Sequence, residues 1–254
     1  MTGQPDLVKV EFDGAVCEVV INRPEARNAL NLELCGALLD VFSKFQTGGE
    51  VRAVLLRSEG PVFCAGADLK ERKGRDEEWV VARRRAAFDA YAMIERCPLP
   101  VVCAVQGAVV GSGGEIAMAC DFIVASEKAS FLFPEPQWGT VGATQRLQRV
   151  IGVSRAKELL FTGRKMHVQE AYQHGLVTQV IPDADLLGEA RAIVQKIASA
   201  PFLAMQLTKH SIDAGSKTDL VNGIEIEMTA IKQLLAESDW RAGVEKFNSE
   251  IGTR

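Results

Sequence analysis

The chain has 254 residues, 47% of them hydrophobic and 24% charged, which is the composition of a globular protein with a sizeable core. A formal net charge of -4 excludes a general electrostatic attraction to nucleic acid or to an anionic membrane. No stretch approaches the roughly 18 consecutive apolar residues of a membrane span, and the first residues lack the apolar segment of a signal peptide. We therefore expect a cytoplasmic protein that does not interact with membranes.

The cysteines and histidines give no sign of a metal site or of a disulfide framework. None of the six cysteines forms a C-x-x-C pair, and several lie within apolar runs. The three histidines lack the spacing that would bring two ligands to one metal. We expect buried free thiols in a reducing compartment and no bound metal.

Strands and helices alternate along most of the chain. Residues 6–21 show a strand alternation around the turn at Asp13-Gly14 and predict a β-hairpin. Apolar and polar periodicity predicts further strands at 51–59, 99–107, 121–126 and 176–182. It predicts helices at 32–45, 76–96, 154–161, 168–175 and 186–199, and only helices after Pro201. The pattern indicates an α/β core followed by a helical C-terminal region.

The stretch VFCAGADLKE, residues 62–71, has small residues where a strand passes into a charged segment. A surface loop at such a place is normally built from Asn, Asp, Ser or Pro. Alanine and glycine are favoured where another group must approach the backbone closely. The stretch therefore indicates a binding site that uses the main chain.

A second stretch, AVQGAVVGSGGEIAMACD at 104–121, leads from an apolar strand through a glycine-rich loop into a helix. Free N–H groups at such a turn favour negative charge. Three known glycine loops each fail at a required residue: Ile116 replaces the third glycine of a dinucleotide fingerprint, no G-K-[ST] exists, and Val110 replaces the first glycine of a nucleophile elbow. A phosphate loop, or a hydrolase with Ser112 as nucleophile, is therefore disfavoured.

Two glutamates stand out near these glycines. Glu115 begins the apolar helix EIAMAC, and Glu135 lies in SFLFPEPQWGT. If both point into a dry pocket, desolvation raises their pKa values, and the pair can share acid and base roles. The residues alone leave open the alternative that both are ordinary solvated glutamates.

Seven stretches in order resemble the signatures of the crotonase superfamily, the enoyl-CoA hydratases and isomerases, over roughly residues 6–182: INRPEARNALN, VFCAGADLKE, AVQGAVVGSGGEIAMACD, FPEPQWGT, TQRLQRVIG, AKELLFTGR and EAYQHGLVTQVIP. The resemblance implies a crotonase-like ββα spiral core with an acyl-CoA site over 1–195. It implies a helical trimerisation region over 196–254, which packs subunits into a homotrimer or a dimer of trimers.

The resemblance also implies a reaction through an enolate of an acyl-CoA thioester. By motif, the backbone N–H groups of Ala67 and Ser112 form the oxyanion hole, with each donor contributing on the order of 3 kcal/mol. Glu115 orients and activates water, and Glu135 delivers a proton to the α-carbon. The presence of both acids favours a hydratase, and coenzyme A belongs to the substrate, so no separate cofactor is expected.

The same resemblance places coenzyme A and substrate binding on backbone and side chains near these motifs. The residues implied are Ala26, Ala65, Gly66, Asp68, Leu69, Lys70, Gly111 and Trp138. Lys70 and Arg23 are candidates to meet the phosphates. The alternative for both is that they are ordinary solvated charges.

The match departs from the family pattern after Glu135, where GTVGA is about three residues shorter than the usual loop and lacks its Pro-Gly pair. This change leaves two alternatives for Trp138, a wall of the acyl pocket or plain core packing. It also leaves open an isomerase, or a hydratase of a branched, aromatic or heteroatom-bearing acyl-CoA. A non-catalytic, RNA-binding member is less favoured, because no basic stripe is visible.

Overall fold

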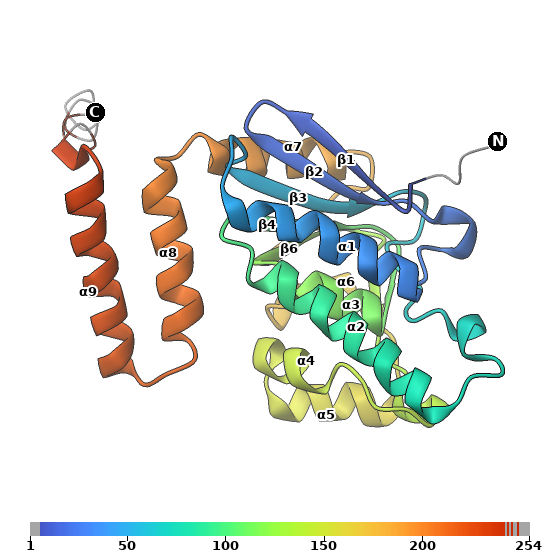
Figure 1. Cartoon of the computed structure of the whole chain (residues 1–254). Helices are drawn as coiled ribbons and strands as arrows, with labels where there is room; N and C mark the ends of the chain where they lie inside the picture. Colours follow the sequence, from blue (N-terminus) through green and yellow to red (C-terminus); the bar gives the residue numbers. More distant parts are fainter. Residues whose placement is uncertain (1–5, 242, 244, 246–247, 249–254) are drawn as a thin grey trace.

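The computed structural model describes residues 6–241 together with 243, 245 and 248 (Figure 1). Strands and helices alternate as the sequence predicts, and the α/β class is confirmed. The strands are β1 (Val8–Asp13), β2 (Val16–Ile21), β3 (Ala53–Ser58), β4 (Val101–Val105), β5 (Ala108–Val110), β6 (Phe122–Ser126), β7 (Ser130–Leu132), β8 (Met166–His167) and β9 (Gln179–Ile181). The α-helices are α1 (Leu32–Lys44), α2 (Glu77–Glu95), α3 (Ser112–Met118), α4 (Thr144–Ile151), α5 (Val153–Thr162), α6 (Val168–Gln173), α7 (Leu186–Ala198), α8 (Phe202–Gly215) and α9 (Leu220–Glu237).

The main sheet of the described chain has six strands in the order β1-β2-β3-β4-β6-β9. The predicted hairpin is present as the antiparallel pair β1–β2, and every other pairing in this sheet is parallel. Every residue of β2 and of β4 is buried. Strands that are buried along their whole length are typical of a sheet covered on both faces.

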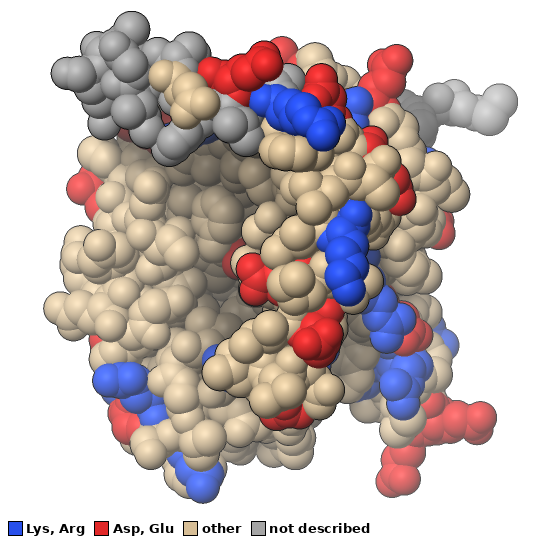
Figure 2. Space-filling view, turned by 90° about the vertical axis from the view of Figure 1, so that its left-hand side faces the viewer, with Lys and Arg blue, Asp and Glu red and all other residues tan. Residues whose placement is uncertain are grey.

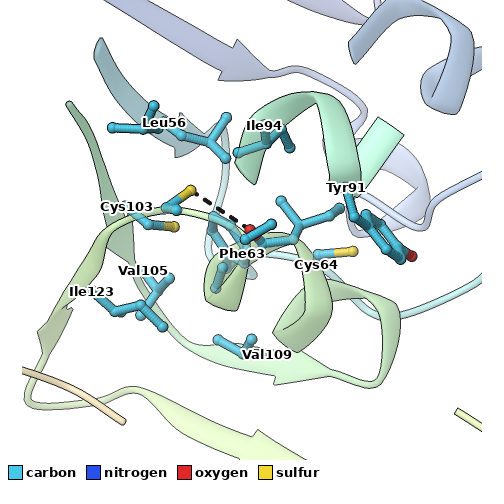
Figure 3. Close-up of a cluster of buried hydrophobic side chains, with 14 of the residues drawn as sticks. Leu56, Phe63, Cys64, Tyr91, Ile94, Cys103, Val105, Val109 and Ile123 are labelled. Carbon is cyan, nitrogen blue, oxygen red and sulfur yellow. Dashed lines mark hydrogen bonds between the residues drawn. The ribbon is translucent and has the colours of Figure 1, made fainter. Parts of the chain in front are cut away.

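Helices cover the two faces of this sheet (Figure 1). On one face, α1 and α2 pack their apolar sides into the larger core. On the other face, Leu186, Ala190 and Val194 of α7 pack against the strands. Figure 3 shows the centre of the larger core, where Phe63 lies among side chains from β3, β4 and α2. Phe63, which directly precedes the small residues of the 62–71 stretch, is thus fixed in the core.

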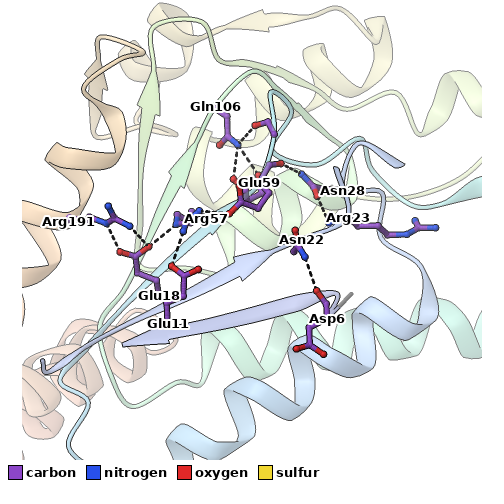
Figure 4. Close-up of polar contacts among 12 residues, drawn as sticks. Asp6, Glu11, Glu18, Asn22, Arg23, Asn28, Arg57, Glu59, Gln106 and Arg191 are labelled. Carbon is purple, nitrogen blue, oxygen red and sulfur yellow. Dashed lines mark hydrogen bonds and ion pairs between the residues drawn. The ribbon is translucent and has the colours of Figure 1, made fainter. Parts of the chain in front are cut away.

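A buried carboxylate joins α7 to the sheet (Figure 4). Glu18 on β2 accepts from Nε of Arg57 on β3 at 2.7 Å and from Nε of Arg191 on α7 at 2.5 Å. Burial works to raise the pKa of Glu18, but the hydrogen bonds from Arg191 and Arg57 outweigh it and lower that pKa. The network therefore fixes the position of α7 through a charged group.

A second sheet, with the order β5-β7-β8, lies beside the first. Its strands are two or three residues long, so the sequence periodicity did not reveal them. The bridge between Cys64 and Val109 joins the small-residue stretch to β5. This contact brings the two informative stretches of the sequence together.

Helices α8 and α9 pack against each other and extend away from the sheets (Figure 1). The predicted helical tail is present over the described residues, and the rest of the predicted 196–254 region lies outside them. Several large apolar side chains on this pair are exposed, namely Ile212, Leu220, Val221, Ile224, Met228, Ile231 and Leu235. The trimerisation role of this region stays a prediction.

Three expectations about composition can be compared with the structure. All six cysteines are buried and free, as predicted. The described residues contain no group of three or more His, Cys, Asp or Glu side chains arranged to hold a metal ion. Within the same residues, no helix combines the length and the apolar character that crossing a membrane requires.

Candidate active site

Three chain segments meet side by side at the candidate site. The Leu30 N–H donates to the Gly66 carbonyl at 2.8 Å, and the Asp68 N–H donates to the Leu30 carbonyl at 2.9 Å. On the opposite side, the Val110 N–H donates to the Cys64 carbonyl at 2.9 Å. The stretch 64–68 is therefore held between the loop before α1 and the strand before α3.

Two amide groups at this junction are uncommitted. Within the described part of the chain, the N–H groups of Ala67 and Ser112 donate to no acceptor, although the neighbouring amides of Asp68 and Gly111 do. Gly66 has φ +93°, and a Cβ there would lie 3.2 Å from the Val110 carbonyl oxygen. The segments that carry these two N–H groups are thus in direct contact, and their role as an oxyanion hole stays a prediction.

The glycines at the start of α3 are explained by close packing. A Cβ on Gly113 would lie 2.8 Å from the Cys64 carbonyl oxygen, and one on Gly114 would lie 2.5 Å from the Phe133 ring. Any larger residue would push the first turn of α3 away from the 64–68 segment. The small residues therefore set the separation between the two uncommitted amides.

Glu115 lies in the first turn of α3 and is 2% exposed. Its Oε1 is 3.9 Å from Nη1 of Arg146, and among the described residues its buried Oε2 has no hydrogen-bond partner. Burial raises the pKa of Glu115, Glu135 adds to this effect, and the guanidiniums of Arg146 and Arg84 oppose it. The alternative that Glu115 is an ordinary solvated glutamate is wrong.

Glu135 is 7% exposed and leads into a 3₁₀ turn over Pro136–Trp138. A Cβ on Gly111 would lie 2.5 Å from its Oε1, and a Cβ on Gly142 would lie 2.8 Å from its Cγ. Its buried Oε2 has no hydrogen-bond partner within the described chain. Burial raises the pKa of Glu135, while its own N–H and Arg84 oppose the shift. The carboxyl group therefore lies beside the residue that precedes the Ser112 amide.

The hydrolase alternative receives no support from the surroundings of Ser112. A serine nucleophile needs a general base within hydrogen-bond reach. Over the described residues, no hydrogen bond joins Ser112 to any of the histidines. The side chain is buried, at 2% exposure, in the first turn of α3.

The loop expected to bind coenzyme A is held by a buried asparagine that the sequence analysis did not single out. The Asn28 amide donates to the carbonyls of Glu59 and Val62, at 2.8 Å each, and its Oδ1 accepts from the Arg23 N–H at 2.9 Å. Asn28 has φ +54°, a left-handed conformation that asparagine tolerates better than most residues. The only sign of Asn28 in the sequence was its position within the motif INRPEARNALN.

The polar residues predicted for coenzyme A lie at the edge of the site. Arg23 Nη1 contacts Asp68 Oδ2 at 2.7 Å, so this cation already has an anionic partner. Burial works to raise the pKa of Asp68, but the hydrogen bond from Arg23 outweighs it and lowers that pKa. Leu69 and Lys70 are exposed beside Asp68, and Ala26 is half-buried. This arrangement leaves Lys70 better placed than Arg23 to meet a phosphate.

Trp138 is 59% exposed, so the alternative that it packs in the core is wrong. The shortened loop turns outward here, with left-handed backbone at Gly139 (φ +67°) and at Ala143 (φ +54°). Helix α4 begins at Thr144, directly after this turn. The side chain of Trp138 remains available at the surface next to the Glu135 turn.

Two arginines near the acids were not predicted from sequence. Arg146 on α4 donates to Glu95 at 2.8 Å and faces Glu115. Arg84 on α2 donates from Nη2 to the Val141 carbonyl at 2.9 Å. The available signals were the TQRL motif for Arg146 and the RRR run at 83–85 for Arg84. Both cations favour ionisation of Glu115.

Comparison with known proteins assigns the family. The model of the enoyl-CoA hydratase/isomerase family matches residues 11–251. The chain is 35% identical to a short-chain-enoyl-CoA hydratase of Clostridium acetobutylicum over 94% of each chain. It is 34% identical to an enoyl-CoA isomerase/hydratase of Mycosarcoma maydis, over 92% of this chain and 90% of that one.

A solved structure of an enoyl-CoA hydratase from Bacillus anthracis is similar to the whole fold. It superposes with a TM-score of 0.92 at 36% identity and covers 96% of both chains. The crotonase-like core expected from the sequence motifs is thereby confirmed. The chain belongs to the enoyl-CoA hydratase/isomerase family, and it is an enzyme of that family.

Proposed function

We propose that this enzyme adds water reversibly across the 2,3 double bond of a trans-2-enoyl-CoA, with Glu115 and Glu135 as its two acids. The observation that supports this most is the pair of buried carboxyl groups, each with one oxygen that has no partner among the described residues. Glu135 lies against Gly111, the residue before Ser112, and Glu115 follows Ser112 in the first turn of α3. A site with two acids and two backbone donors suits addition of water to a conjugated thioester.

In the proposed reaction, the water oxygen bonds to the β-carbon while the electron pair of the double bond moves onto the thioester oxygen. The N–H groups of Ala67 and Ser112 donate to that oxygen as its negative charge develops. Each donor contributes about 3 kcal/mol to stabilising the transition state. The amides suit this role because they need no rearrangement to meet the charge.

The two acids divide the proton transfers. Glu115, ionised and faced by Arg146, accepts a proton from the attacking water. Glu135, protonated, gives its proton to the α-carbon. Burial raises the pKa of Glu135 and so favours the protonated form that this step requires. Proton transfer between the two acids or with solvent then restores the starting state.

The first test is hydration of crotonyl-CoA, followed by the loss of the conjugated thioester absorbance. Glu115→Gln and Glu135→Gln are each expected to lower kcat by roughly 10² to 10⁴-fold, because each removes one proton-transfer step. Glu158→Gln serves as the control. It removes an exposed carboxylate of α5 that pairs with Arg164, and its turnover is expected to be unchanged. Full activity in either active-site variant would contradict the proposed roles.

A second candidate is migration of the double bond through the same enolate. The name of the Mycosarcoma maydis relative includes both isomerase and hydratase. A 3-enoyl-CoA would report this reaction by a gain of the conjugated thioester absorbance. Faster turnover of the 3-enoyl-CoA than of crotonyl-CoA would make isomerisation the main activity.

We propose further that the enzyme works in the cytoplasm as a homotrimer or a dimer of trimers, without a metal or redox cofactor. The exposed apolar side chains of α8 and α9 support assembly. On the face of the molecule nearest these helices, a broad uncharged area lies beside a hollow, and the charged side chains gather along one side (Figure 2). The reaction itself supports the absence of a cofactor, since addition of water involves no net oxidation.

A further inference from the structure

A cavity of about 290 Å³ lies between α2 and the shortened loop that follows Glu135. Its wall combines the guanidinium groups of Arg72, Arg84 and Arg85 with the apolar side chains of Val81, Phe88 and Val141. Among the described residues, no carboxylate lines it. An apolar wall with several cations and no anion suits a ligand that has a short hydrocarbon part and a negatively charged end.

Arg84 is the cation of this cavity that bonds to the loop beside Glu135: it contacts Val141, and a Cβ on the next residue, Gly142, would lie 2.8 Å from the Glu135 Cγ. Its positive charge also opposes the upward pKa shifts of Glu115 and Glu135. Its Nη2 donates to the Val141 carbonyl, and its guanidinium carbon lies 5.8 Å from the centre of the Phe88 ring. Within the described chain its Nε and Nη1 have no acceptor. The guanidinium is therefore held in place while Nε and Nη1 remain able to donate to a ligand.

Arg72 adds a second cation, which forms no ion pair within the described residues although the charge of Glu71 acts on it. Its Nε is buried and has no hydrogen-bond partner among the described residues. Burial lowers the pKa of Arg72, and the positive charges of Arg84 and Arg83 lower it further. The nearby carboxylate of Glu71 is taken by Arg83, at 2.6 Å. Two neighbouring arginines thus repel each other at a site where an anion would relieve that repulsion.

The position of the cavity identifies which part of the substrate would reach it. The segment that carries Val141 follows Glu135, and Gly142 contacts the Glu135 side chain. The phosphates of coenzyme A are expected on the other side of the 64–68 segment, near Lys70. A chain that passes between the two acids therefore reaches Arg84 with its acyl end.

Resting on the hydratase function proposed above, we infer that Arg84 recognises a carboxylate at the far end of the acyl chain. The substrate class is then a short enoyl-CoA whose acyl group ends in a carboxylate. The apolar wall contacts the methylene groups, and the fork of Arg84 donates to the two carboxylate oxygens. Arg72 supplies further positive charge.

The test compares two saturated thioesters that cannot be hydrated, 4-carboxybutanoyl-CoA and its methyl ester, by titration calorimetry. The wild-type protein is expected to bind the free carboxylate at least roughly tenfold more tightly than the ester, because one charge-assisted contact is lost in the ester. Arg84→Met is expected to remove this difference, and Arg84→Lys to retain part of it. Arg149→Met is the control: it removes one arginine that bonds only to Gln145 on its own helix, and it should keep the difference.

Three results would overturn the inference. The first is equal or weaker binding of the carboxylate by the wild type, and the second is a preference that persists in folded Arg84→Met. The third is a parallel loss of affinity for both thioesters in Arg84→Met, which would assign Arg84 to a phosphate of coenzyme A. A carboxylate preference that depends on Arg84, in a protein that hydrates no enoyl-CoA, would uphold the inference while contradicting the proposed hydratase.

Discussion

At the scale of single residues, the two acids combine a chemical role with a cost in stability. Burial disfavours the ionised form of Glu115 and Glu135, so the folded protein holds their protons more tightly than the unfolded chain does. A carboxyl group with a raised pKa contributes its stability at low pH and loses it as the pH rises through the folded-state pKa. The active site is thus a place where the fold is weakened at neutral pH.

Glu135→Gln should therefore be more stable than the wild type near neutral pH, although it is less active. The difference in Tm is expected to widen from acidic to neutral pH and to reach about 2 °C or more, because glutamine carries no charge to desolvate. Calorimetric scans between pH 4 and pH 8 would measure it. Glu158→Gln is a control with the opposite sign. Because Arg164 lowers the pKa of Glu158, this variant should become less stable than the wild type as the pH rises. A constant gap for Glu135→Gln across this range would contradict the assignment of a raised pKa.

The sequence pointed to the residues of this site because the motifs lie in local stretches, and the burial of Glu115 and Glu135 removes the alternative that they are solvated. The roles of these two acids and of the Ala67 and Ser112 amides stay predictions. The sequence did not predict Arg84, because a helix pattern does not show which loop a helix residue faces. Trp138 was ambiguous for a related reason: one aromatic residue in a shortened loop has no periodicity that distinguishes an exposed side chain from a buried one.

At the scale of elements, the longer strands and helices followed from their periodicity, whereas β5, β7 and β8 did not. Strands of two or three residues hold no complete alternation, and they form here because they pair with one another and, at Val109, with Cys64. Attachment of α7 to the sheet is likewise invisible in sequence. It depends on Glu18 and Arg191, which are far apart along the chain.

Glu18→Gln is expected to destabilise the protein by about 2 kcal/mol, since it removes the charge that Arg57 and Arg191 bond to. The loss is smaller than for an unpaired buried charge, because Arg57 keeps Glu11 and Glu59 as partners and Arg191 is 46% exposed. Urea unfolding would measure the change. The stabilisation by Glu18, whose pKa is lowered, should also fade as the pH falls through that pKa, so wild type and variant should converge in acid. Equal stability at neutral pH would show that α7 is held by apolar contacts alone.

At the scale of the whole molecule, α8 and α9 carry an apolar surface that is exposed among the described residues. Ile224 and Ile231 lie one above the other on α9 at helical spacing, with 48% and 41% exposure. Exposed apolar area of this kind is typical of a subunit interface. The division of the chain into a core over 1–195 and an assembly region over 196–254 stays a prediction on this basis.

The double substitution Ile224→Asp and Ile231→Asp is expected to convert the assembly into monomers, because two carboxylates would have to be buried at the interface. Light scattering coupled to size-exclusion chromatography would measure the mass. Lys157→Glu, an exposed change on α5 of the core, should leave the mass unchanged. A wild-type protein that is itself monomeric would contradict the proposed trimer.

The contact between Glu135 and two glycines determines when this side chain loses its conformational freedom. With Gly111 and Gly142 closed against it, the carboxyl group has few rotamers left before any substrate arrives. A freely rotating glutamate would lose that freedom in every catalytic cycle, at the moment of proton transfer. Here the side chain is ordered once, when the chain folds, and the acid is already oriented when each substrate binds.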